Sequence, residues 1–504
     1  MANKIDSNLT GLAMAEEASI GVLPVSPIWR ALEPNSYEGF GGEITTIARD
    51  PIAVGRQRKK GVITDLEASG GFQTDLLPYL DRIMQSFMFA DARQKMSTYT
   101  LENPPTVITI TGITTGPNTL TAASGLDGFA VNQLVKISGA TTAANNIMVT
   151  VTTAAAATLT VSETLVPETP TAACVAEVCG YEFPESDLDI NVTGEVVTLT
   201  SAAIDMSTLG VIVGEWIYLG GDAADNTFVN NQGYARIASI TATTWTLEET
   251  TWTPQTEAAG TFDIRVFFGT VIKNENTTAL IVTKSLQFER QVGEDANGVQ
   301  SEYITGAIAN ELSVNMTSAD KATVDMSFIA ADSETRDGTT GIKAGTRVTA
   351  PAQDAFNTSS DVVRNRIYIV DATLNPTALF AYASEVTLTI NNNAEGLKAI
   401  GTLGNFDVNV GTFEVGGSVT AYFTTVAAVA AIRANSDVAY NLIVAKNSKA
   451  VIFDIPLLSL GDGAITIEKD SPVTIPLETF GAENTNGYTL LINFFPHLPA
   501  AAMP

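Results

Sequence analysis

The chain has 504 residues, of which 45% are hydrophobic and 16% charged, and this length indicates several domains rather than one. Its 27 Lys and Arg against 55 Asp and Glu give a formal net charge of −28, which disfavours tight nucleic-acid binding because phosphates are neutralised by clustered cations. The sequence shows neither a signal-peptide pattern nor an apolar stretch long enough to span a bilayer, so we expect synthesis in the cytoplasm and no membrane partner.

The first hundred residues predict two strands followed by a helix. Alternating apolar residues indicate strands at 42–48 and 61–72. A helix is expected from a cap at Thr74 and Asp75 to about Ala90. The expected core positions are Val62, Leu66 and Phe72 on the second strand and Leu76, Leu77, Leu80, Ile83, Met84 and Phe87 on the helix.

A basic segment at 49–60 separates these two strands. It holds the only dense cluster of cations in the chain, namely Arg49, Arg56, Arg58, Lys59 and Lys60. In so acidic a protein, such a cluster suits contact with an acidic surface, and a solvated turn is the alternative interpretation.

The middle of the chain predicts two similar β modules, at 101–182 and 183–272. Residues 129–139 and the Ala-Ala-Asn-Asn run after them resemble residues 209–221 and the Ala-Ala-Asp-Asn run that follows. Short strands with turn signals at intervals favour tandem small barrels or sandwiches.

The cysteines and tryptophans of these modules are candidates for a functional role. Cys174 and Cys179 would point to opposite faces of a strand, so we expect two free thiols. The tryptophans Trp216, Trp245 and Trp252 favour a small core or a domain seam over a sugar-stacking surface.

Asp and Glu are the only abundant residues of a type that could act in catalysis, as paired carboxylates. Asp187 with Asp189 and Glu248 with Glu249 are candidates, which we interpret as solvated strand or turn positions. The only histidine, His497, is expected at the surface near the C-terminus. Phosphate-binding, nucleophile-elbow and dinucleotide motifs are absent from the sequence. We therefore expect no enzyme, no catalytic, cofactor-binding or metal-binding residues, and no cofactor.

The last part of the chain, 273–504, returns to long strands. Strands are expected at 279–283, 286–290, 312–316 and 322–328, and a long polar loop at 331–366. A strand at 385–390, a loop, strands at 406–411 and 413–423 and a helix at 425–434 then repeat the order seen between Ile44 and Ala90. The chain is therefore predicted to be mainly β, with a β-sandwich or barrel fold that is either single or present twice, each copy then having one helix.

Both ends of the chain resemble the tail tube (major tail) proteins of long, flexible-tailed bacteriophages. The resemblance rests on Gly41 to Ile52, Arg56 to Gly61, Thr64 to Phe72, Ser285 to Gln291 and Gly401 to Gly417. It covers residues 10–95 and 275–495, so 1–100 and 273–504 would be the two parts of the tube domain and the middle modules an insertion.

The resemblance implies a structural protein of the virion tail that assembles in the host cytoplasm. Rings of three or six copies would stack into a hollow tube for DNA, which passes without adhering because the lumen is acidic. Tape measure, tail terminator and distal tail proteins would be further partners. As a hypothesis, Arg49, Arg56, Arg58, Lys59 and Lys60 contact the next ring.

Two other classes of function remain open from the sequence alone. One is a cell-surface or adhesive β-repeat protein that binds carbohydrate, and the other is the carboxylate-based hydrolase. Only a tube protein is expected to form rings or hollow filaments by itself.

Overall fold

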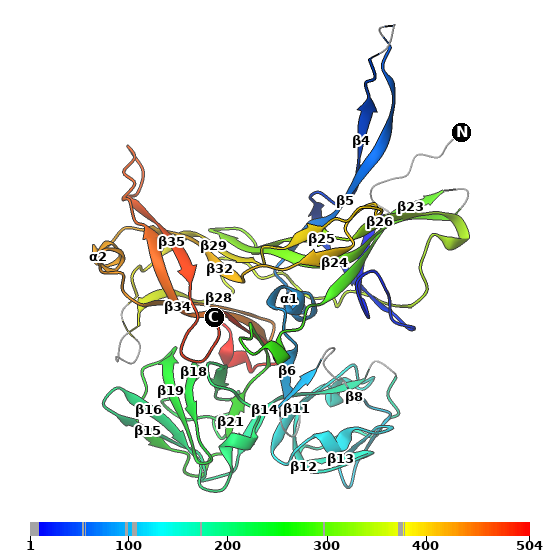
Figure 1. The fold of residues 1–504 in the computed structure, drawn as a ribbon. Helices are drawn as coiled ribbons and strands as arrows, with labels where there is room; N and C mark the ends of the chain where they lie inside the picture. Colours follow the sequence, from blue (N-terminus) through cyan, green and yellow to red (C-terminus); the bar gives the residue numbers. More distant parts are fainter. Residues whose placement is uncertain are drawn as a thin grey trace.

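The computed structural model describes residues 10–52, 55, 57–95, 99–102, 108–171, 174–295, 298–370, 376 and 378–504. The protein is mainly β, as predicted. Its described strands form a 20-stranded sheet built from both ends of the chain, a 14-stranded sheet built from the middle, and a small two-stranded sheet. Figure 1 shows the middle of the chain on one side of the large sheet and the long β4–β5 arm projecting away from it.

The first copy of the repeated fold takes strands from both sides of the insertion. Its elements are β1 (Gly11–Glu16), β2 (Ile28–Leu32), β3 (Pro34–Tyr37), β4 (Gly41–Arg49), β5 (Lys59–Asp75), α1 (Asp81–Met88), β6 (Ala92–Lys95), β7 (Tyr99–Glu102), β22 (Thr270–Lys273), β23 (Ser285–Asp295), β24 (Gly298–Thr317), β25 (Thr323–Ala330), β26 (Asp332–Arg336) and β27 (Thr346–Val348).

The second copy is continuous in the sequence. It comprises β28 (Val362–Ile369), β29 (Ala383–Asn391), β30 (Glu395–Leu397), β31 (Asp407–Asn409), β32 (Glu414–Tyr422), α2 (Ala427–Ala434), β33 (Val438–Lys446), β34 (Lys449–Asp462), β35 (Thr474–Gly481) and β36 (Leu491–Phe495).

Strand order confirms the duplication. The hydrogen-bonded order β1–β23–β24–β25–β5–β3 of the first copy matches β28–β33–β34–β35–β32–β29 of the second. The only α-helices of the described residues, α1 and α2, follow β5 and β32. Even a register shift recurs, between Pro34 and Ser36 in one copy and between Ala383 and Glu385 in the other.

The inserted region contains two units with the same strand order. The first has β8 (Ile108–Thr109), β9 (Gly112–Thr114), β10 (Thr119–Thr121), β11 (Gln133–Ser138), β12 (Met148–Ala155), β13 (Thr158–Val161) and β14 (Val175–Phe183), and the second has β15 (Asp189–Thr193), β16 (Val196–Thr200), β17 (Trp216–Leu219), β18 (Gly233–Ile240), β19 (Thr244–Thr250), β20 (Glu257–Ala258) and β21 (Ile264–Phe267). The order β9–β10–β13–β12–β11–β14 matches β15–β16–β19–β18–β17–β21, and β14 pairs with β21 to join the units. The boundaries 101–182 and 183–272 stay a prediction.

The second inserted unit is fixed to the second copy by buried contacts. Arg236 on β18 and Asp454 on β34 are both buried, and their charged groups lie 3.1 Å apart. Arg364 on β28 pairs with Glu249 on β19, which is 1% exposed. The expectation of solvated carboxylates is therefore wrong for Glu249, and also for buried Asp187, which accepts hydrogen bonds from the backbone of Ala202 and Ala203.

The tryptophans and cysteines lie where the sequence placed them. Trp216 and Trp245 are fully buried, and the indole of the partly buried Trp252 donates to Asn231 Oδ1. Cys174 and Cys179 are free and buried. Trp216 belongs to the seam between the insertion and the second copy, since its backbone N–H donates to Asn493 Oδ1.

Three expectations about local structure are wrong. The helix α1 starts at Asp81 because β5 continues through Asp75 to pair with β25. The predicted strand 279–283 is a 3₁₀ turn and coil before β23. The polar stretch 331–366 is not one long loop, because β26 pairs with β24, β27 pairs with β2, and β28 begins within it. The predicted core positions of the first copy are buried except Val62, which is 54% exposed on the arm.

His497 is partly buried rather than fully exposed. The backbone N–H of its neighbour Leu498 donates to Ser448 O, and Tyr234 of the insertion donates its hydroxyl to Ala502 O. Burial lowers the pKa of His497 to about 4, reinforced by the charges of Lys136 and Lys449 and opposed by Asp222. A histidine in an unfolded chain titrates near 6.5.

This difference predicts a pH dependence of stability. The unfolded chain takes up a proton at His497 below about pH 6.5 while the folded chain does not, so the contribution of neutral His497 is lost as pH falls from about 6.5 towards 4. Because the chain has a single histidine, an NMR titration of the imidazole reads this group alone. A midpoint near 4 is expected, and His497→Gln should remove the part of the dependence that this group contributes. A midpoint near 6.5 would contradict the effect of burial on the imidazole.

Candidate functional site

Six adjoining strands of the large sheet, β5, β25, β24, β29, β32 and β35, have one apolar face and one polar face. Along β24 the side chains of Leu312, Val314 and Met316 are buried, whereas those of Ser313 and Asn315 between them are partly exposed. The apolar face packs with α1 and α2 in one hydrophobic core. This alternation places every second residue on the opposite, solvent-facing side.

The polar face runs without interruption from the first copy into the second. Cross-strand register aligns one row of residues over β5, β25, β24, β29, β32 and β35: Asp75, Thr323, Asn315, Thr387, Ser418 and Glu478. Strand alternation and register assign to this face Glu67, Ser69, Gln73, Asp75, Glu311, Ser313, Asn315, Thr317, Thr323, Asp325, Ser327, Glu385, Thr387, Thr389, Asn391, Glu414, Ser418, Thr420 and Glu478.

Hydrogen bonds connect this face across the boundary between the copies. Asp325 Oδ1 accepts from Gln73 Nε2 at 2.8 Å, and Asp325 Oδ2 accepts from Asn315 Nδ2 at 2.6 Å. The hydroxyl of Thr387, on the second copy, donates to Asn315 Oδ1 at 3.2 Å. Uncharged partners thus hold Asp325 in place and leave its negative charge unneutralised.

The strand residues assigned to the polar face include no Lys or Arg. Two lysines reach its margin from loops: Lys321 lies 2.7 Å from Asp75, and Lys398 hydrogen-bonds to Asp65 and Glu67. The bond from Lys398 lowers the pKa of Asp65. The surface therefore consists mainly of carboxylates, hydroxyls and amides, with the exposed ring of Phe480 among them, and its negative charge repels anions.

The arm formed by β4 and β5 carries the predicted basic cluster. Arg49 pairs in register with Lys59 at its far end, and Arg49, Arg58, Lys59 and Lys60 are all exposed. Among the described residues these four have no ion-pair partner. Arg56 lies outside the described residues.

The arm also exposes apolar side chains, among them Val62, which was expected in the core. Ile44, Ile47, Val62 and Ile63 are each more than half exposed. Apolar alternation along β5 indicates a strand, but it does not reveal that β4 and β5 extend beyond the sheet and pair there only with each other. These apolar side chains are exposed for that reason. An exposed arm with both apolar and basic side chains suits a protein contact.

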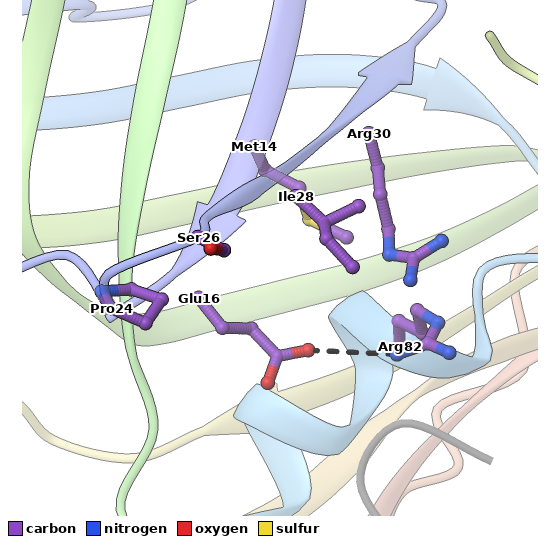
Figure 2. A pocket seen from close by; sticks show the side chains of 7 residues that line it. All are labelled: Met14, Glu16, Pro24, Ser26, Ile28, Arg30 and Arg82. Atoms are coloured by element: carbon purple, nitrogen blue, oxygen red, sulfur yellow. Dashed lines mark ion pairs between the residues drawn. The ribbon is translucent and has the colours of Figure 1, made fainter. Parts of the chain in front are cut away.

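One small pocket lies between β1, β2 and α1, on the helix side of the sheet (Figure 2). Its volume is about 170 Å³, and Met14, Ile28 and Pro24 form its apolar part. The guanidinium groups of Arg30 and Arg82 lie side by side there, with Glu16 3.9 Å from Arg82. Burial, reinforced by Arg30, lowers the pKa of Arg82 to about 10. This pocket lies apart from the polar face.

Two further observations concern sites of other kinds. In the described ranges, three or more His, Cys, Asp or Glu side chains never gather in a way that could hold a metal ion. Neither α1 nor α2 has the length and apolar character that crossing a bilayer would require.

Comparison with protein families identifies a matching family. The family model described as phage tail tube protein matches residues 7–228 and 212–481. The two matched segments do not coincide with the two structural copies, since the first copy takes β23, β24 and β25 from beyond the insertion. No curated protein matches the chain.

Proposed function

The chain belongs to the phage tail tube protein family, and we propose that its copies close into rings that stack into the hollow tube of a long, flexible tail, the conduit for DNA during ejection. The family is a structural one of the virion tail and not a family of enzymes. The observation that carries the proposal is the polar face, which is continuous over both copies and backed everywhere by core.

Open strand edges support ring closure. Within the described residues of one chain, β3 and β4 pair on one side only, with β5, and the end of β34 pairs on one side only, with β35. Exposed edges of this kind invite uncontrolled association, and closing a sheet into a barrel removes them. With two copies per chain, three chains supply the six folds of a pseudo-sixfold ring, and six chains remain the alternative.

The polar face then lines the bore. Its carboxylates repel DNA phosphates, and its hydroxyl and amide groups keep a layer of water between the wall and the passing strand. The inserted modules lie on the other side of the sheet (Figure 1) and would decorate the outside of the tube. The tape measure, tail terminator and distal tail proteins would be partners at the bore and at the tube ends.

The basic arm is assigned to stacking. Its four described cations have no carboxylate partner within the described part of the chain, while the protein as a whole has a surplus of acidic groups. Contact with an acidic surface of the next ring would give these cations carboxylate partners and would neutralise part of the surplus negative charge. Its exposed isoleucines and Val62 would be buried in the same contact.

The carbohydrate-binding alternative has no support from the aromatic residues. Trp216 and Trp245 are fully buried and Trp252 is hydrogen-bonded to Asn231, so these side chains do not form an open stacking platform.

Lysines placed on the polar face should make the bore adhesive. We expect tubes of the Ser418→Lys/Thr420→Lys variant to retain short DNA at low salt and to release it as salt rises, because the phosphates then meet cations. Co-sedimentation of labelled DNA with tubes measures this. Thr485→Lys, at an exposed site in the β35–β36 loop, is the control. Equal DNA retention by both variants would contradict the assignment of this face to the bore.

Neutralising the arm should separate ring formation from stacking. The Arg58→Ser/Lys59→Ser/Lys60→Ser variant is expected to form rings but only short tubes or none, because the cations that meet the next ring are gone. Negative-stain microscopy gives the length distribution, and Arg433→Ser, an exposed arginine at the end of α2, is the matched control. Wild-type tube lengths would overturn the stacking role, and absence of rings in the wild-type protein would overturn the proposed function itself.

A further inference from the structure

The two copies within one chain are joined edge to edge. Residues Glu311 to Thr317 of β24 pair antiparallel with Glu385 to Asn391 of β29. On the core side of this joint Met316 faces Val386, and both are buried. On the polar side Thr387 and Asn315 are hydrogen-bonded. Each strand at the joint has its other edge occupied, β24 by β25 and β29 by β32.

The counterparts of these two strands can be identified residue by residue. The shared register shift equates Ser36 with Glu385 and Tyr37 with Val386. In the second copy β34 takes the place of β24, and its hairpin with β35 continues beyond Asp462, because Thr466 bridges Thr474. Thr474 corresponds to Thr323, the partner of Asn315, so Thr466 corresponds to Asn315 and Ile467 to Met316.

In the described structure both counterpart edges are open. Residues 36–43 pair with β5 alone. Residues 461–468 pair only with β35 and with the residues just before it. The side chain of Ile467 is 77% exposed, although that of its counterpart Met316 is 6% exposed. An apolar side chain that is exposed at a position where its counterpart is buried indicates a surface that another chain covers.

We propose that residues 461–468 of one chain pair antiparallel with residues 36–43 of the next chain, repeating the joint found within the chain. This inference rests on the proposed function and specifies which edges meet and in what register. Thr466 lies opposite Glu38, Ile467 opposite Tyr37, and Glu468 opposite Ser36. The contact is head to tail, from the second copy of one chain to the first copy of the next, so it closes when the rotation completes a ring.

Paired cysteines test the register directly. In assembled wild-type-like rings, the Glu38→Cys/Thr466→Cys variant should oxidise to disulfide-linked dimers and larger species on a non-reducing gel. Asn315→Cys/Thr387→Cys, at the joint within the chain, should form only an intramolecular bond. Glu38→Cys/Thr485→Cys is the out-of-contact control. The native Cys174 and Cys179 are buried and do not compete.

The outcomes separate this inference from the proposed function. Rings that assemble without a bond between positions 38 and 466 would overturn the edge assignment and leave the tube function standing. Failure of the unmodified protein to form any ring would overturn both.

A second variant tests the covered apolar position. Ile467→Asp should leave the far-UV circular dichroism of the chain unchanged, since Ile467 is exposed in the monomer, but should abolish ring formation because a carboxylate would be buried at the joint. Ile400→Asp, at a fully exposed loop isoleucine, should assemble normally. Normal assembly of Ile467→Asp would contradict the proposal.

Discussion

Every strand edge must find partners for its backbone N–H and C=O groups, and this requirement explains most of the molecule. Within the chain it is met where β24 of the first copy pairs with β29 of the second. That joint makes two copies of one fold into a single curved wall with core on one side and polar groups on the other. In the described part of the chain, one edge stays unpaired at 36–43 and another at 461–468, and the proposed pairing of these edges between neighbouring chains would meet the same requirement.

The duplication also explains the position of the insertion. The modules leave the first copy between β7 and β22, yet they dock on the second copy through Arg236, Asp454, Arg364 and Glu249. Buried ion pairs of this type fix orientation more than they add stability, because desolvation offsets much of the attraction between the charges. The modules are thus held firmly on the side opposite the polar face, where they leave that face and the arm free.

The sequence predicted the repeat, the helices and most long strands, because alternation along β25 or β29 and the apolar spacing in α1 are local signals. It did not predict that Val62 is exposed or that Glu249 is buried, since both depend on partners distant in the sequence. The polar face could be predicted strand by strand, but its continuity depends on the register between β24 and β29, which no local pattern contains. The basic cluster is evident from the sequence alone, whereas the open edges become visible only when the two copies are compared in space.

The most direct measurement is a cryo-electron microscopy reconstruction of the assembled protein. The account predicts a bore lined by Asn315, Thr387, Ser418 and their neighbours, with the sheet continuous around the ring and the modules outside. A reconstruction in which each chain's sheet ends unpaired, or in which the inserted modules or the apolar core face the axis, would contradict it.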